Sequence, residues 1–294
     1  MRQTQASDPA DSRHLANRPL VVGELREEIE SGDLPMPVLP SNAREALGLA
    51  LESEPDIREI MRVVERDPAL AARIMEAANS ALHGGHGLVT SVRSALQRLG
   101  VATIQELLMR AVMESQSSEG RNEARLEVLR RHSLLTAHLT KHLAAKLGGN
   151  ADYAFACGLF HDLGHSLVLA LLQRNCQQYL PREESMGLCD MLHSVAGERL
   201  LSAWDLPPLI VEAARTHHDY GSPDDPLAYS YMGNLVAAAD RILYCSEFAA
   251  EPEPEHEAQA EAEAGALEAL GHLGLGPETL GELREWVQKL IDGL

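Results

Sequence analysis

Apolar residues recur every three to four positions along most of the chain, which is the spacing of amphipathic helices. In the first half this pattern predicts about five helices. They lie within residues 41–52, 56–67, 67–82, 91–100 and, from near Thr103, up to 115. Asp67 followed by Pro68 is a typical helix start, and Gly100 is a typical helix end. Pro55 interrupts the pattern, and the GGHG stretch at 84–87 is expected to be a flexible break.

The same spacing continues in the second half of the chain. Helices are predicted within residues 127–149, 181–206, 209–221 and 229–245, with a last one near the C-terminus. We identify no convincing strand pattern, and aromatic residues make up only 4% of the chain. Sheets favour β-branched and aromatic residues, so this composition suits packed helices. The predicted fold class is therefore all-α.

Shifts in composition divide the chain into five predicted segments. These are a disordered N-terminus (1–18), an N-terminal helical lobe (19–116), a second helical lobe (117–246), an acidic low-complexity linker (247–265) and a C-terminal helix (266–294). The boundary between the lobes is placed at the polar stretch SSEGRNE, residues 117–123. The linker reads EFAAEPEPEHEAQAEAE from residue 247, and such a composition favours a solvated, flexible chain.

The formal net charge is −19, and residues 247–294 contribute −10 of it from twelve acidic and two basic side chains. A strongly acidic protein is repelled by phosphate backbones and by anionic membranes. Nucleic acids and membranes are therefore not expected as partners. The first twenty residues lack a secretory signal, and we identify no run of about 18 apolar residues that would form a transmembrane helix. The expected location is the cytoplasm.

Candidate chemistry is concentrated in the second lobe. His161 and Asp162 lie side by side in YAFACGLFHDLGHSLVLALL (153–172), which otherwise reads as buried core. A buried carboxylate is costly unless it is paired, hydrogen-bonded or bound to a metal. Five further side chains of the right chemistry lie on or beside predicted helices: His132, His193, His217, His218 and Asp240. Imidazole nitrogens and carboxylate oxygens bind divalent cations, so these seven residues are candidate metal ligands.

Other interpretations of these residues stay open at this stage. A single histidine in a helix is more often exposed or hydrogen-bonded than a metal ligand. His138 and His142 have the i, i+4 spacing that can hold a metal, but they also fit a solvated helix face beside Lys141. The four cysteines form no CxxC pair, so a thiolate zinc site is not indicated.

The order of these residues resembles the HD superfamily of metal-dependent phosphohydrolases. LPMPVLP (34–40), DPALAARIMEAANSAL and SVRSALQRLG closely resemble the HDOD family, the HD-related output domain of bacterial signalling proteins. The second half resembles the same family through His132-Ser133, GLFHDLGHSLVL and HSVAGERLLSAWDLPPLIVEAARTHH. The resemblance covers about residues 20–245. It implies a two-lobed fold, with an N-terminal helical bundle packed on an HD-like lobe.

Many HDOD proteins are described as having lost parts of the HD ligand set, whereas this chain retains it. By resemblance to the HD-GYP phosphodiesterases, one ion would be held by His132, His161, Asp162 and Asp240. Asp162 would bridge to a second ion held by His193, His217 and His218. Ligands that are all nitrogen and oxygen suit Fe, Mn, Zn or Ni alike.

Three departures from the HD-GYP pattern bear on activity. HD-GYP enzymes have a phosphate-neutralising Lys three residues after the HD aspartate, where this chain has His165. The Glu that holds a third metal is replaced by Val128. The GYP triplet is also missing after His217-His218, which argues against cyclic dinucleotide specificity.

Three functional hypotheses follow. The first is a regulatory protein that binds divalent metal, and a nucleotide or phosphorylated small molecule, and signals to a protein partner. The second is an active metal-dependent phosphodiesterase or phosphohydrolase in which Asp162 bridges the metals. The third is a metal-free interaction scaffold. The function class is not decided by the fold alone.

Overall fold

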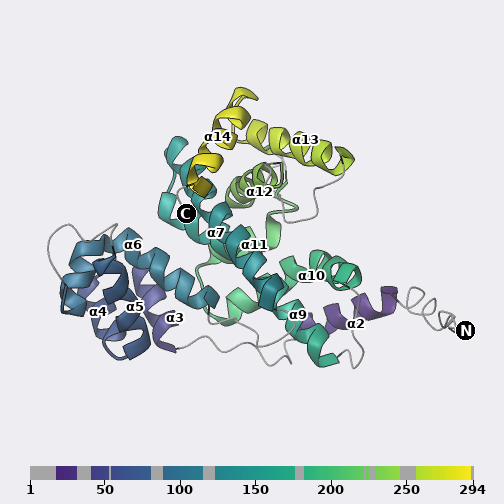
Figure 1. Cartoon of the computed structure of the whole chain (residues 1–294). Helices are drawn as coiled ribbons and strands as arrows, with labels where there is room; N and C mark the ends of the chain where they lie inside the picture. Colours follow the sequence, from purple (N-terminus) through teal and green to yellow (C-terminus); the bar gives the residue numbers. More distant parts are fainter. Residues whose placement is uncertain are drawn as a thin grey trace, which may run out of the picture.

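In the computed structural model, the described residues are 18–31, 41–52, 54–80, 89–114, 123–175, 182–221, 223–224, 229–245 and 256–292. All regular elements in these ranges are α-helices, and none is a strand (Figure 1). The prediction of an all-α fold is therefore confirmed. Residues 1–17 of the predicted disordered N-terminus (1–18) and the GGHG break lie outside the described residues, as does most of the predicted lobe boundary.

The N-terminal lobe contains α3 (Ser41–Ala50), α4 (Ile57–Val64), α5 (Pro68–Asn79) and α6 (Val92–Glu114), which pack on one another at one end of the molecule (Figure 1). The predicted start of α5 is confirmed, because the Asp67 side chain accepts hydrogen bonds from the backbone N–H groups of Ala69 and Leu70. Gly100 has a φ of 75° and interrupts α6, as expected for a helix end.

The second lobe contains α7 (Glu123–Lys146), α8 (Ala151–Phe160), α9 (Gly164–Asn175), α10 (Arg182–Ala203), α11 (Pro208–Thr216) and α12 (Tyr231–Tyr244). The central element is α8, whose residues 154–160 are all buried. It packs on α7, α11 and α12 and also contacts α6 of the first lobe. The lobes are further joined by a 2.5 Å ion pair between Lys141 of α7 and Glu106 of α6.

The first helix in the described part of the chain packs away from the N-terminal lobe. Helix α2 (Arg18–Ser31) belongs by sequence to the segment predicted as N-terminal lobe, but it packs on α10 of the second lobe (Figure 1). Arg199 of α10 donates hydrogen bonds to the backbone carbonyls of Ile29 and Glu30, at 3.2 and 2.6 Å. These carbonyls at the end of α2 lack partners within the helix, so a cation there is favourable.

The acidic segment is also corrected, because α13 (His256–His272) begins within the predicted linker of residues 247–265. Its apolar side chains, including Ala266 and Leu270, are buried against α12, which explains why an acidic sequence is helical here. The next helix is α14 (Glu278–Asp292), which docks through Leu280, Leu283 and Val287. Residues 247–255 of the predicted linker lie outside the described part of the chain.

One stretch, Ala151–Arg174, is long and apolar enough to cross a membrane by length and composition alone. The sequence reasoning expected no such stretch. In the fold it forms α8, a turn and α9, and 83% of its most apolar part is buried against other helices. Core packing accounts for its apolar composition.

Two glycines allow unusually close helix contacts on either side of the His161-Asp162 pair. A Cβ atom at Gly158 of α8 would lie 2.8 Å from the Cα of Ala137 on α7. A Cβ atom at Gly164 would collide with the carbonyl oxygen of His193 and lie 2.5 Å from the backbone nitrogen of Gly197, both on α10. The absence of side chains therefore brings α7 and α10 directly against the pair.

We expect Gly164→Ala to destabilise the protein by about 1–3 kcal/mol or more, because the added methyl group must push α9 away from the backbone of α10. Denaturation in urea measures the change. The control is Gly281→Ala on α14, where an added Cβ meets no atom within 4 Å. That change should stabilise the protein slightly, by up to about 1 kcal/mol, because alanine is a better helix former. Equal effects of the two substitutions would contradict the proposed close contact.

Candidate metal centre

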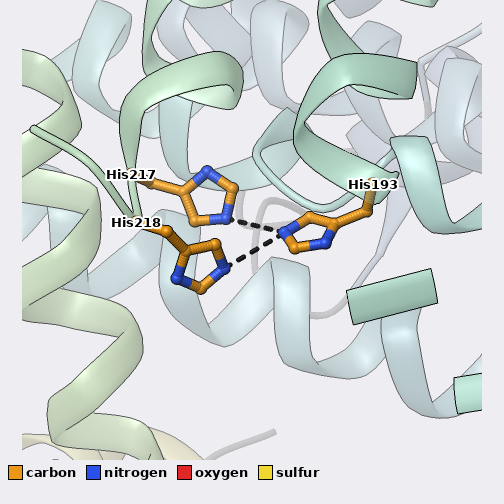
Figure 2. A group of neighbouring side chains, drawn as sticks. All are labelled: His193, His217 and His218. Atoms are coloured by element: carbon orange, nitrogen blue, oxygen red, sulfur yellow. Dashed lines mark hydrogen bonds between the residues drawn. The ribbon is translucent and has the colours of Figure 1, made fainter. Parts of the chain in front are cut away.

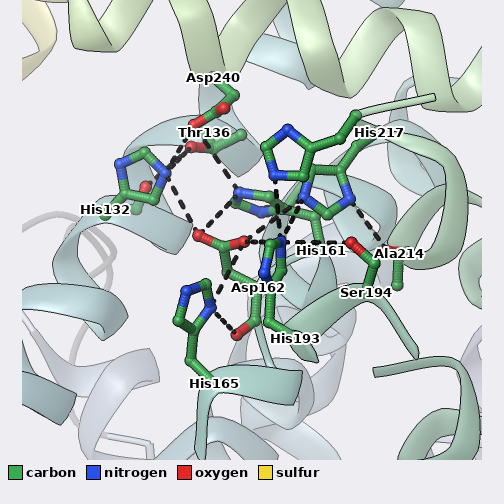
Figure 3. A network of polar contacts seen from close by, with 12 residues as sticks. His132, Thr136, His161, Asp162, His165, His193, Ser194, Ala214, His217 and Asp240 are labelled. Atoms are coloured by element: carbon green, nitrogen blue, oxygen red, sulfur yellow. Dashed lines mark hydrogen bonds and ion pairs between the residues drawn. The ribbon is translucent and has the colours of Figure 1, made fainter. Parts of the chain in front are cut away.

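The structure brings the seven candidate ligands and His165 together at one place in the second lobe (Figure 3). They come from four helices and from the segments that directly follow two others. His132 lies on α7, His165 on α9, His193 on α10 and Asp240 on α12. His161 and Asp162 directly follow α8, and His217 and His218 directly follow α11. The His161-Asp162 pair thus lies at a helix end and not within one continuous helix.

Asp162 is at the middle of the group, and its two carboxylate oxygens face different partners. Oδ2 lies 3.3 Å from Nε2 of His161 and 3.8 Å from Nε2 of His132. Oδ1 lies 3.5 Å from Nε2 of His217 and 3.6 Å from Nε2 of His193. One carboxylate is therefore shared between two sets of imidazoles, the arrangement in which a carboxylate can bridge two cations.

The first set consists of His132, His161 and Asp240. The Nε2 atom of His132 is 2.9 Å from Oδ1 of Asp240, and Nε2 of His161 is 3.9 Å from the same oxygen. The side chains of His132 and Asp240 are 28% and 22% exposed, while His161 is fully buried. This side of the centre can therefore be reached from solvent.

The second set consists of His193, His217 and His218, whose Nε2 atoms converge (Figure 2). The Nε2 atom of His193 lies 3.2 Å from Nε2 of His217 and 3.1 Å from Nε2 of His218. His193 and His217 are buried, and His218 is exposed. Three imidazoles and the Oδ1 oxygen of Asp162 together make a four-ligand set.

The backbone determines which nitrogen of the buried rings carries a proton. The Nδ1 atoms of His161, His193 and His217 lie 2.8, 3.1 and 2.9 Å from carbonyl oxygens of their own helices. A carbonyl only accepts, so in each neutral ring Nδ1 donates and Nε2 has a lone pair. Metal-bound histidines in proteins are commonly oriented by such bonds.

Two consequences of these tautomers support a cation. The Nε2 lone pairs of His193 and His217 face each other at 3.2 Å, an arrangement that is repulsive unless a proton or cation lies between the rings. The buried Nε2 atom of His161 has no hydrogen-bond partner. Leaving a buried polar atom unsatisfied costs about 1–3 kcal/mol. These lone pairs are therefore better satisfied by divalent cations than by hydrogen bonds among the side chains themselves.

The electrostatic state of the groups also suits metal binding. Burial alone would raise the pKa of Asp162, but the nearby His161 and His165 hold it well below its usual range. Burial would raise the pKa of Asp240 too, but its hydrogen bond to His132 and the charges of His132 and His161 together lower it. Burial lowers the pKa of His193 to about 3. At neutral pH the carboxylates are therefore charged and His193 is a neutral ligand.

His165, expected at a phosphate-binding position, is oriented by two carboxylic residues. Its ring stacks on His193 at 4.3 Å between centroids. Its Nδ1 atom lies 3.1 Å from the backbone oxygen of Asp162, and its Nε2 atom lies 3.5 Å from Oδ1 of Asp190. Burial lowers the pKa of His165, but the charge of Asp162 and the hydrogen bonds to Asp190 and Asp162 together raise it above its usual value.

His138 and His142 do not join the centre. The His138 ring packs edge-on against Phe155, and the His142 ring stacks on Trp286 of α14 at 4.4 Å. Their i, i+4 spacing therefore serves helix packing. The sequence interpretation of a solvated face is only partly right, since both side chains are half-buried.

Sequence reasoning did not identify the residues that position the ligands. Gly158 and Gly164 flank the His161-Asp162 pair, and glycines within an apolar helix pattern were the available signal. Arg241, next to Asp240, lies against Gly265 of α13 and 5.8 Å from the Tyr220 ring. It thus connects α12, the segment after His218 and α13, a contact that no local pattern indicates.

A family model for the HDOD domain matches residues 36–220. The chain belongs to the HDOD family. The match ends before Asp240, so one residue of the first set lies on a helix beyond the matched region. The resemblance seen in the sequence is thereby confirmed as to family.

Solved structures show the same fold at low sequence identity. A candidate metal-dependent phosphohydrolase of Shewanella amazonensis SB2B has a TM-score of 0.63 and 19% identity, covering 92% of this chain and 99% of that one. An HDOD domain protein of unknown function from Geobacter sulfurreducens has a TM-score of 0.59 and 21% identity, covering 94% and 99%. These similarities support the two-lobed HDOD fold.

Among curated proteins, an uncharacterised protein of Treponema pallidum (strain Nichols) is 26% identical over 222 residues. These residues are 70% of this chain and 41% of the relative. A ribonuclease Y of Acholeplasma laidlawii (strain PG-8A) is 30% identical over 112 residues, which are 38% of this chain and 17% of the relative. The chain thus spans less than half of the length of the curated relatives it matches.

The lowered pKa of His193 predicts an acid-sensitive metal-free protein. An unfolded histidine titrates near 6.5. Below that pH His193 is protonated in the unfolded chain, whereas in the folded chain it stays neutral down to about pH 3. The stability contribution is thus present above about pH 6.5 and is lost as the pH falls. Urea unfolding of the metal-free proteins measures the free energy of unfolding at each pH. Between about pH 6.5 and 4 this free energy should fall less for His193→Gln than for the wild type. The same fall in both proteins would contradict the prediction.

Proposed function

We propose that this HDOD protein is a bacterial signal-transduction protein that binds two divalent cations. The first would be held by His132, His161, Asp162 and Asp240, and the second by Asp162, His193, His217 and His218. One observation supports the proposal most strongly, namely that each oxygen of Asp162 faces a different set of imidazoles. The metal is one that accepts nitrogen and oxygen ligands, such as Fe, Mn, Zn or Ni.

A ligand is expected to bind on the exposed side of the centre, next to His132, His218 and Asp240. Four protein ligands leave coordination positions for further groups on most of these metals. A nucleotide or phosphorylated small molecule offers anionic oxygens for such positions. Binding there would change the conformation of α7 and α8, which contact α6 of the first lobe. This change would be recognised by a signalling protein partner. The expected site of this process is the cytoplasm.

The second candidate function is a metal-dependent phosphohydrolase. Two retained and adjacent ligand sets favour it, because divalent cations polarise a phosphate ester and activate water as a nucleophile. The protein residues would hold the ester at the exposed side and keep the buried imidazoles in one tautomer. A third candidate, a metal-free interaction scaffold, leaves the facing lone pairs of His193 and His217 without compensation.

We expect Asp162→Asn to reduce the metal content from about two ions per chain to one or none, because the amide cannot supply two anionic oxygens to neighbouring cations. Elemental analysis of anaerobically purified protein measures it. The matched control is Asp152→Asn, a carboxylate at the exposed start of α8. Metal-free wild-type protein from such a preparation would support the scaffold instead.

A substrate panel separates the first two functions. Metal-loaded protein is incubated with cyclic dinucleotides, cyclic mononucleotides and nucleotides, and hydrolysis is followed by chromatography. Turnover that Asp162→Asn lowers at least about a hundredfold would identify an enzyme, since several kcal/mol of charge stabilisation are lost. Binding of a nucleotide without turnover would identify a sensor.

A further inference from the structure

A crevice opens beside the metal centre between α7 and the start of α9. Its volume is about 20 Å³. Such a space accommodates about one oxygen-sized atom. Its lining residues are Leu126, Leu129, Arg130, Ser133, Asp162, Leu163 and Ser166. The crevice therefore joins the carboxylate at the middle of the centre to the side of α7.

The floor of the crevice contains a hydroxyl group without a partner. Ser133 is 1% exposed, and its Oγ atom has no hydrogen-bond partner. The other hydroxyl in the lining is already used, because Ser166 donates to the backbone oxygen of Leu163 at 2.7 Å. An unsatisfied buried hydroxyl costs about 1–3 kcal/mol. A ligand oxygen seated on the floor would remove this cost.

Arg130 supplies a positive charge at the same place. Its side chain is 18% exposed and donates to Glu127 through Nη2 at 2.7 Å and Nε at 3.0 Å. Glu127 is 71% exposed, so this pair is solvated on the carboxylate side and can exchange for another anion. In a protein of net charge −19, an anionic ligand needs such a local cation. His165 cannot replace it, because both of its nitrogens face oxygens of Asp162 and Asp190.

We propose that this crevice binds one phosphoryl group of the ligand, with Ser133 and Arg130 as its protein partners. One phosphoryl oxygen would accept a hydrogen bond from Ser133, and the Arg130 guanidinium would exchange Glu127 for the phosphoryl group. The remaining oxygens would face the cation beside Asp162. The proposal rests on the proposed function, since without a cation Asp162 would repel the anion. It assigns a position on α7 to one phosphoryl group of the ligand.

The test uses inorganic phosphate as the probe and the full metal-loaded chain, with affinity measured by calorimetry. Arg130→Gln should weaken phosphate binding about tenfold, as expected for loss of one charge-assisted hydrogen bond. Arg131→Gln removes the same charge from the exposed neighbour and should leave the affinity within about twofold. Glu127→Gln should strengthen binding, because it removes the carboxylate that competes for Arg130. Equal affinities of the Arg130 and Arg131 variants would overturn the proposal.

Ser133→Ala gives a second, independent readout. The variant removes an unsatisfied hydroxyl, so metal-free protein should be at least as stable as the wild type, while its metal-loaded form binds phosphate more weakly. A purely structural role of Ser133 would lower stability and leave phosphate affinity unchanged, and a crevice that holds only a water molecule would leave affinity unchanged in all variants. Either outcome overturns the proposal.

Elemental analysis accompanies each affinity measurement. A wild-type protein that binds no metal contradicts the proposed function, whatever its phosphate affinity. A wild type with two ions whose affinity does not depend on Arg130, Glu127 or Ser133 contradicts the crevice alone.

Discussion

The shared carboxylate of Asp162 is the interaction on which the rest of this lobe depends. Its side chain is 12% exposed and faces imidazoles on both oxygens. A charge in such a position is unfavourable unless several groups compensate it. The histidines that face it come from three helices and from the ends of two more, so keeping this carboxylate ionised requires those elements to meet at one point.

Close helix contacts make that meeting possible. Gly158 lets α8 approach α7, and Gly164 lets α9 approach α10, so that His132 and His193 reach opposite sides of Asp162. Beyond the region matched by the family model, α12 packs on α13, and Gly265 leaves room there for the side chain of Arg241. Asp240 therefore reaches the centre through packing that involves the acidic C-terminal segment, which gives this segment a structural role in the second lobe.

The two halves of the centre differ in a way that bears on function. Besides the shared Asp162, the second set consists of three imidazoles and is largely buried, whereas the first includes the carboxylate of Asp240 and is partly exposed. A ligand can reach the centre from the first half without unfolding the second. The crevice with Ser133 and Arg130 lies beside the same carboxylate. The binding of metal and the binding of a phosphoryl group would therefore both depend on Asp162.

Much of this protein follows from its sequence by itself. The 3.6-residue spacing determines the helices, Asp67-Pro68 determines the start of α5, and the buried His161-Asp162 pair indicates a polar centre inside an apolar lobe, because local patterns depend on neighbours in the chain. Tertiary structure alone decided that α2 packs on α10, that α13 begins at His256, and that the two oxygens of Asp162 face separate sets of histidines. These features depend on contacts between residues far apart in the chain, such as Arg199 with Glu30 and Arg241 with Gly265. No local pattern contains such contacts, since their energy arises only when the helices pack together.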